Sequence, residues 1–224
     1  MTLPRTLTRR EFTFALSTTA LAAAAGFSPF GLFRSAEAQD ANLAELVKPV
    51  PLGDVVLGPA DAPVTIIEYA SMSCGHCAEF HRTIYPKLKA EYIDTNKVRY
   101  IFREFPLDIK AAAGAMLARC VGKDDPKKYH AVVDILFATQ NDWVLKDTSE
   151  QLRRVAKQAG MNDETFNACL GNQSMLDALK QGQDQAFEKF KVDSTPTFFV
   201  NGTKLKGGAT LEDFKKLIDP NLKS

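Results

Sequence analysis

The feature that most constrains this chain is a pair of cysteines, Cys74 and Cys77, at the junction of two hydrophobic patterns. Residues 63–70 form a nearly continuous, β-branched apolar run, which is typical of a strand buried on both faces. Residues 74–94 repeat apolar side chains at every fourth position, which predicts a helix bent at Pro86. The sequence therefore places the cysteines where a central strand ends and a helix begins.

The other segments predict a sheet that is interrupted by helices. A second strand over 98–105 completes a strand, helix, strand order, which implies a parallel pair with a right-handed crossover. Residues 39–61 read as an extended lead-in with a short edge strand at 55–57. The remaining predicted elements are helices over 111–121, 127–139, 149–159, 163–171 and 174–190, strands over 197–200 and 203–206 joined by Asn201-Gly202, and a helix over 211–218 capped by Thr210.

The N-terminal segment has the pattern of an export signal. Arg9 and Arg10 precede a weakly apolar stretch over 14–27, which resembles a twin-arginine signal. A small-x-small pattern at 36–38 favours cleavage after Ala38, so we expect a signal peptide over 1–38. The alternative is an uncleaved membrane anchor, but glycines and a proline leave less than the roughly 20 apolar residues that a spanning helix needs.

The charge of the mature chain argues against two classes of partner. The full sequence has 28 Lys and Arg against 27 Asp and Glu. The leader holds four of the arginines and two of the glutamates, so the mature chain has 24 basic and 25 acidic residues and a net charge of −1. Such a balance provides no basic surface for nucleic acid or for an anionic membrane. We expect partners that are recognised by other chemistry.

The paired cysteines supply that chemistry. A sulfur at the start of a helix is stabilised as a thiolate by free backbone N–H groups, which predicts that Cys74 is the nucleophile and Cys77 the resolving thiol of a redox-active disulfide. A protonated His76 would stabilise the thiolate further. The alternatives are a structural disulfide or half of a zinc site with His81, for which the sequence offers no convincing fourth ligand. We therefore expect neither a metal nor another cofactor.

These motifs together resemble a known family. Cys74-Gly75-His76-Cys77 after a buried strand, then a helical block, then Thr195-Pro196-Thr197 before a strand, is similar to the DsbA-like branch of the thioredoxin superfamily. The resemblance implies an α/β thioredoxin fold over 39–106 and 192–224 with an inserted all-helical domain over 107–191. It also implies disulfide transfer to exported proteins with free cysteines, and a membrane partner that reoxidises the enzyme.

The resemblance assigns roles to three further residues. It implies a cis peptide bond before Pro196, which would face the cysteines and let Thr195 contact an extended substrate. An ordinary trans proline at a strand entry is the alternative. It also implies that Glu68 is a buried acid that accepts or relays the proton of Cys77, the alternative being a carboxylate at a strand end.

The remaining cysteines, Cys120 and Cys169, fall in the first and fourth helices of the block. They either form a structural disulfide or are two small buried hydrophobic residues. We favour the disulfide, which would close a long loop.

The direction of the redox chemistry stays open at this point. Gly75 stands where the best-known oxidases of the family have proline, and Cys-Gly-His-Cys also occurs in protein disulfide isomerases. The lead-in is shorter than the roughly 40 residues that a dimerisation domain would need. We therefore favour a monomeric periplasmic oxidase, with an isomerase or reductase as one alternative and a non-catalytic envelope chaperone or metal-binding protein as another.

Overall fold

The computed structural model describes residues 41–123 and 125–222. The predicted signal peptide and its cleavage site lie outside the described residues. In chain order the elements before the helical block are α1 (Leu43–Leu46), β1 (Val55–Leu57), β2 (Val64–Ala70), α2 (Gly75–Thr83), α3 (Tyr85–Leu88), the π-helical turn η1 (Lys89–Ile93) and β3 (Val98–Glu104). The block contains α4 (Ile109–Gly122), α5 (Pro126–Ala138), α6 (Gln140–Leu145), α7 (Thr148–Gln158), α8 (Asp163–Leu170) and α9 (Gln173–Phe190). The chain continues with β4 (Thr197–Val200), β5 (Thr203–Lys206), α10 (Leu211–Ile218) and the 3-10 turn η2 (Asp219–Leu222).

The five strands form one sheet in the order β1-β3-β2-β4-β5. β2 and β3 are parallel, whereas β1 pairs with β3, β4 with β2, and β5 with β4 in antiparallel fashion. The prediction that β2 is central and β1 an edge strand is confirmed. In this register Glu68 of β2 lies between Phe102 of β3 and Phe198 of β4.

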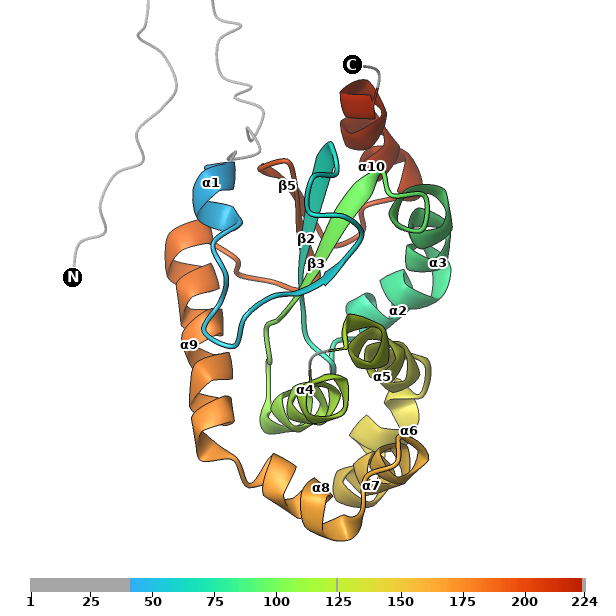
Figure 1. Ribbon diagram of the computed structural model, residues 1–224, viewed down its shortest axis with the longest axis vertical. Coiled ribbons are helices and arrows are strands. Elements are labelled where there is room, and N and C mark those ends of the chain that lie inside the picture. The colour runs from blue at the N-terminus through green and yellow to red at the C-terminus, as the bar shows by residue number, and fades with distance from the viewer. Residues whose placement is uncertain (1–40, 124, 223–224) are drawn as a thin grey trace, which may run out of the picture. The chain divides into compact units, whose positions relative to one another are not determined.

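Helices cover both faces of the sheet, with α9 on one side and α2, α3 and α10 on the other (Figure 1). Alternation along β2 sends Ile67 and Tyr69 into the core beside α1 and α9, and sends Ile66 and Ala70 into the larger core beside α2, α5 and α10. Glu68 lies two positions from both Ile66 and Ala70, so its side chain points to the same face of the sheet as theirs. Its carboxylate therefore lies on the face that α2 covers.

The prediction of one continuous helix over 74–94 is wrong. α2 stops at Thr83, and α3 begins at Tyr85 with Pro86 in its first turn, where the missing N–H costs no hydrogen bond. η1 then continues with π-helical bonding. Proline thus breaks this segment into pieces instead of bending one helix.

Two short helices were not predicted. α1 lies in the lead-in that we expected to be extended, where Asn42 caps it and Leu46 anchors it in the core. α6 adds a helix to the predicted block, beginning at the buried Gln140. Both are too short for a hydrophobic period to be recognised in the sequence.

The sheet and the helical block are joined by a buried ion pair. Glu104 at the end of β3 accepts two hydrogen bonds from Arg119 of α4, of 2.5 and 2.7 Å, and one of 2.6 Å from the hydroxyl of Tyr129 of α5. The charge of Arg119 and these hydrogen bonds hold the pKa of Glu104 below its usual range despite complete burial. The boundaries of the inserted domain, 107 and 191, remain predictions.

The C-terminal hairpin follows the predicted pattern. Asn201 and Gly202 both adopt positive φ, 47° and 95°, as the tight turn between β4 and β5 requires. No helix within residues 41–123 or 125–222 has the length and apolar character to cross a membrane.

Candidate active site

The paired cysteines lie at the junction of β2 and α2. Cys74 is the N-cap residue of α2, with extended backbone angles, and Cys77 lies in the first turn of the helix. The Cys74 side chain is partly exposed, whereas Cys77 is fully buried, and both are free thiols in this structure. An incoming sulfur can therefore approach Cys74 but not Cys77.

The two thiols differ strongly in acidity. Hydrogen bonding from the Cys77 thiol outweighs burial and, with the backbone N–H groups of His76 and Cys77, lowers the pKa of Cys74 to about 5. Burial raises the pKa of Cys77 far above its ordinary value, and the neighbouring charges of Cys74 and Glu68 raise it further. At neutral pH Cys74 is a thiolate and Cys77 a thiol.

The His76 side chain is exposed. The contact through which it stabilises the Cys74 thiolate is its backbone N–H. The predicted effect of an imidazolium charge at this position stays a prediction.

The segment before β4 faces the cysteines. The peptide bond between Thr195 and Pro196 is cis. The Cys74 thiol donates a 3.3 Å hydrogen bond to the carbonyl oxygen of Thr195. The Thr195 hydroxyl is buried without a hydrogen-bond partner among the described residues, and it lowers the pKa of Cys74 because it can donate to the thiolate.

Residues that sequence reasoning missed hold the loop between β2 and α2. The Gln140 side-chain amide, at the start of α6, donates 2.9 Å hydrogen bonds to the carbonyl oxygens of both Met72 and Cys74. Ser73 donates to the carboxylate of Asp108, the N-cap of α4, at 2.7 Å. A single glutamine in an unrecognised helix gives no signal in the sequence, so these contacts could not be foreseen.

Three exposed apolar side chains come from the segments next to this loop. Leu107 lies just before α4, Ile109 begins that helix, and Leu145 ends α6. The backbone N–H of Leu107 donates to Ser71, next to the cysteine loop, at 3.3 Å. Lys110 in turn bonds the carbonyl of Val144 at 2.6 Å, which joins the start of α4 to the end of α6.

Glu68 lies within β2, not at its end, and is fully buried. One carboxylate oxygen accepts a hydrogen bond from the Tyr100 hydroxyl, and the other lies 3.2 Å from Nε2 of His81 on α2. Its charge raises the pKa of Cys77, so the acid acts on the buried thiol through space. Sequence reasoning considered His81 only as a zinc ligand beside Cys77. In the structure its Nε2 faces Glu68.

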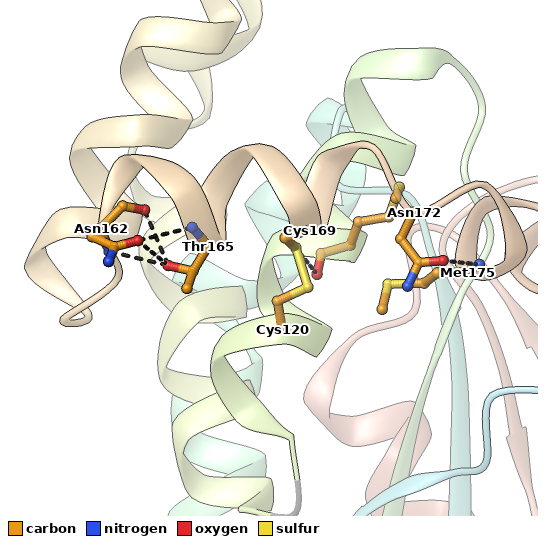
Figure 2. The surroundings of a disulfide bond; sticks show 7 residues. Cys120, Asn162, Thr165, Cys169, Asn172 and Met175 are labelled. Carbon is orange, nitrogen blue, oxygen red and sulfur yellow. Dashed lines mark hydrogen bonds between the residues drawn. A yellow bond between two sulfur atoms is a disulfide. The ribbon is translucent and has the colours of Figure 1, made fainter.

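The second pair of cysteines lies within the helical block. Cys120 of α4 and Cys169 of α8 are joined by a disulfide with an S–S distance of 2.08 Å (Figure 2). A reciprocal capping box between Asn162 and Thr165 begins α8 and helps to fix the helix that carries Cys169. Within residues 41–123 and 125–222, no group of three or more His, Cys, Asp or Glu side chains is arranged to hold a metal ion.

Comparison with known proteins gives consistent matches. A family model described as "Thioredoxin" matches residues 52–220. The chain is 35% identical over 152 residues to a putative protein-disulfide oxidoreductase of Rickettsia bellii, covering 67% of this chain and 58% of the relative. It is 30% identical over 178 residues to a probable disulfide bond formation protein D of Bacillus anthracis, covering 75% and 77%. The chain thus spans less than two thirds of the length of the Rickettsia bellii relative.

The solved structures agree with these matches. The crystal structure of Wolbachia pipientis alpha-DsbA1 superposes with a TM-score of 0.73 at 34% identity, covering 80% of this chain and 95% of that one. BdbD from Bacillus subtilis gives a TM-score of 0.70 at 27% identity, covering 84% and 100%. The strand, the cysteine pair, the helical block and the cis proline occur in the order that this resemblance implies. The chain therefore belongs to the thioredoxin family, in its DsbA-like branch.

Proposed function

We propose that this chain is an exported thiol:disulfide oxidoreductase that donates the Cys74–Cys77 disulfide to other proteins. The observation that carries the proposal is the opposite shift of the two thiol pKa values, downward for Cys74 and upward for Cys77. A stabilised thiolate favours the dithiol form, which makes the disulfide an oxidant. The names of the relatives, protein-disulfide oxidoreductase and disulfide bond formation protein D, support the same class of reaction.

The reaction proceeds in two exchanges. A substrate thiolate attacks the partly exposed sulfur of Cys74 in the disulfide, a mixed disulfide forms, and Cys77 leaves as a thiolate that takes up a proton. A second substrate thiolate then attacks the substrate sulfur of the mixed disulfide and displaces Cys74. Cys74 is a good leaving group because its thiolate is stable at neutral pH. The substrate gains a disulfide and the enzyme gains two electrons.

An extended client segment would be held beside Thr195 and Pro196. The Thr195 carbonyl, 3.3 Å from the Cys74 sulfur, is the backbone group nearest to the point of exchange among the hydrogen bonds of this site. Exposed Leu107, Ile109 and Leu145 offer apolar contact area to unfolded chains, which expose such side chains themselves.

We place the enzyme in the periplasm as a monomer. The twin-arginine pattern before Ala38 and the family resemblance support export. Each turnover leaves two electrons on the cysteines, so an oxidant must remove them. The resemblance assigns this step to a membrane partner.

The reduction potential of the Cys74–Cys77 pair tests the proposal. Equilibration of the purified mature chain with defined ratios of reduced and oxidised glutathione should give a reduction potential well on the oxidising side of that of thioredoxin, which is about −270 mV. The chain should also oxidise a reduced, unfolded client in stoichiometric amount. A potential as low as that of thioredoxin would favour a reductase, and no exchange at all would favour a binding protein.

A further inference from the structure

The proposed reaction requires a proton at a buried place. Cys77 is fully buried in the first turn of α2, and burial raises the pKa of its thiol, so it cannot remain a thiolate after it leaves the disulfide. A proton must reach Cys77 when the disulfide opens and must depart when the disulfide forms again. The active-site opening exposes Cys74 and not Cys77. This opening therefore does not expose the sulfur that must gain or lose the proton.

Glu68 is the inner end of a route for this proton. The charge of its carboxylate raises the pKa of Cys77, and one carboxylate oxygen accepts a hydrogen bond from the Tyr100 hydroxyl. Burial raises the pKa of Tyr100 well above its ordinary value, so this hydroxyl keeps its proton. The second oxygen of Glu68, 3.2 Å from His81, is the one from which a proton can move on.

His81 lies between Glu68 and the protein surface. Its ring stacks on Phe137 of α5 with 4.3 Å between ring centroids, which fixes the orientation of both nitrogens. Nε2 faces Glu68, whereas Nδ1 lies 3.7 Å from the carboxylate of Asp134 and has no hydrogen-bond partner among the described residues. The side chain of Asp134 is 49% exposed. The ring therefore spans from the core to a solvated carboxylate.

A cleft of about 330 Å³ opens beside the outer nitrogen. His81, Tyr85, Asp134 and Phe137 line it, together with Arg82, Pro86, Lys89 and Ala138. The volume is large enough to admit water molecules to bridge the gap between Nδ1 and Asp134. The buried Tyr85 hydroxyl, which lines the same cleft, likewise has no hydrogen-bond partner among the described residues.

We propose that His81 passes protons between Glu68 and the solvent of this cleft, with Asp134 at its mouth, each time Cys77 gains or loses its proton. This inference rests on the proposed function and extends it by two residues. His81 touches neither sulfur atom, so it is a positioning residue that acts through Glu68. Asp134, 3.7 Å from the outer nitrogen, takes up or returns the proton through the water of the cleft.

The groups around His81 favour its charged form. Burial opposes the charge, but Glu68 from β2 and Asp134 from α5 together raise the pKa of His81 to about 9. The other titratable groups that face it are Tyr85 of α3, whose pKa burial raises, and His130 of α5, whose pKa burial lowers, whereas Tyr100 of β3 is bonded to Glu68. Arg82 and Lys89 are the basic residues of the cleft lining. An imidazolium beside a carboxylate is the arrangement that can deliver a proton inward and recover one from outside.

His130 does not offer the same route. It is 4% exposed, and burial lowers its pKa to about 4, so it is neutral at working pH. Neither of its ring nitrogens has a hydrogen-bond partner among the described residues. Its ring packs on Tyr100 and Tyr129 and does not line the cleft.

Oxidation of the reduced enzyme by oxidised glutathione requires Cys77 to lose its proton. The Cys74 thiolate attacks one sulfur of the glutathione disulfide, which forms the mixed disulfide and releases one glutathione thiolate. Cys77 then loses its proton to Glu68, its sulfur attacks Cys74, and the second glutathione leaves as a thiolate. Because His81 is charged at neutral pH, it first releases its Nδ1 proton to the water of the cleft, and its Nε2 then takes the proton from Glu68. The enzyme has lost two electrons and glutathione has gained them.

Rapid mixing of reduced enzyme with oxidised glutathione, with acid quench and mass spectrometry of the mixed disulfide, separates the two steps. In His81→Gln, which keeps a donor to Glu68 but cannot carry a proton, decay of the mixed disulfide at pH 7 should slow roughly 10²-fold. Its formation should not change, because Cys74 is already a thiolate. Added imidazole should restore part of the decay rate in this variant and leave the wild type unaffected.

Two further variants complete the test. Asp134→Asn should slow the decay to a smaller degree, whereas Asp184→Asn, an exposed carboxylate of α9, should match the wild type. Decay at the wild-type rate in His81→Gln, or slow decay that does not respond to imidazole, would overturn the relay. If His81→Gln does not fold, wild-type decay in Asp134→Asn overturns it instead. A wild type that forms no Cys74–Cys77 disulfide would instead contradict the proposed function.

Discussion

The sulfur of Cys74 lies 3.3 Å from the carbonyl oxygen of Thr195, although 121 positions of sequence separate the two residues. One residue precedes a helix and the other precedes a strand, and the antiparallel pairing of β2 with β4 brings the two ends together. The contact joins the proposed nucleophile to the proposed client-binding segment.

Substitution of Cys74 and substitution of Cys77 should have different effects on disulfide exchange. Cys74→Ser should abolish exchange, because buried Cys77 cannot be reached. Cys77→Ser should keep a reactive Cys74 and accumulate mixed disulfides, because the resolving thiol is absent while the serine hydroxyl can still donate to the Cys74 thiolate. Non-reducing electrophoresis after incubation with a reducible client measures the trapped species. Equal trapping by both variants would contradict the assigned roles.

The Thr195 hydroxyl should tune the acidity of Cys74. Thr195→Val keeps the shape but removes a donor to the thiolate, so the pKa of Cys74 should rise and the disulfide should become a weaker oxidant. Thiolate absorbance during a pH titration of the reduced protein measures the change. Thr197→Val is a matched control, since its buried hydroxyl donates to the carbonyl of Ser194. A similar pKa shift in both variants would argue against a direct effect.

The stability of the reduced protein should depend on pH through Cys74. Its folded pKa, about 5, lies below the value of 9.0 for an ordinary thiol, so the thiolate stabilises the folded state most above pH 9. That contribution decreases as the pH falls and is lost near pH 5. Denaturant unfolding of the reduced and the oxidised protein, measured from about pH 4 to about pH 8, should show a difference in the free energy of unfolding that grows as the pH rises. Reduced Cys74→Ser should lack this component.

The disulfide of the helical block should contribute to stability rather than to exchange. It joins residues 49 positions apart, and a loop of that length gives about 4 kcal/mol in the chain-entropy model. The Cys120→Ala, Cys169→Ala double variant should lose up to that amount in denaturant unfolding while it retains client oxidation. Loss of oxidation with unchanged stability would instead assign the bond a redox role.

Much of the fold could be predicted from periodicity. The apolar run of β2, the Asn201-Gly202 turn and the Thr210 cap each have a local cause, and the structure places strand, hairpin and last helix accordingly. Where tertiary contacts decide, prediction failed. The burial of Leu46 stabilises α1, and a new helix begins at Tyr85 because Pro86 cannot donate the backbone hydrogen bond that a helix interior needs.

The residues of the site likewise fall into those that could be predicted from the sequence and those that could not. Cys74, Cys77 and Pro196 belong to short motifs, so their neighbourhood could be predicted from the sequence. Three further residues lie on helices, where the spacing of apolar residues indicates only which face is buried: His81, Gln140 and Asp134. Their partners depend on how α2, α5 and α6 pack together. A histidine four residues after Cys77 was visible, but nothing in the sequence indicated that it would face Glu68.

The amide of Gln140 has a consequence for protein engineering. One side chain from the helical block supplies both donors to the carbonyl oxygens of Met72 and Cys74, immediately before the reactive helix. A minimal thioredoxin onto which Cys-Gly-His-Cys was grafted without this block would lack those donors, and the buried carbonyl of Met72 would need a new one. Transplanting the four-residue motif therefore transfers the sulfur atoms without the scaffold that orients them.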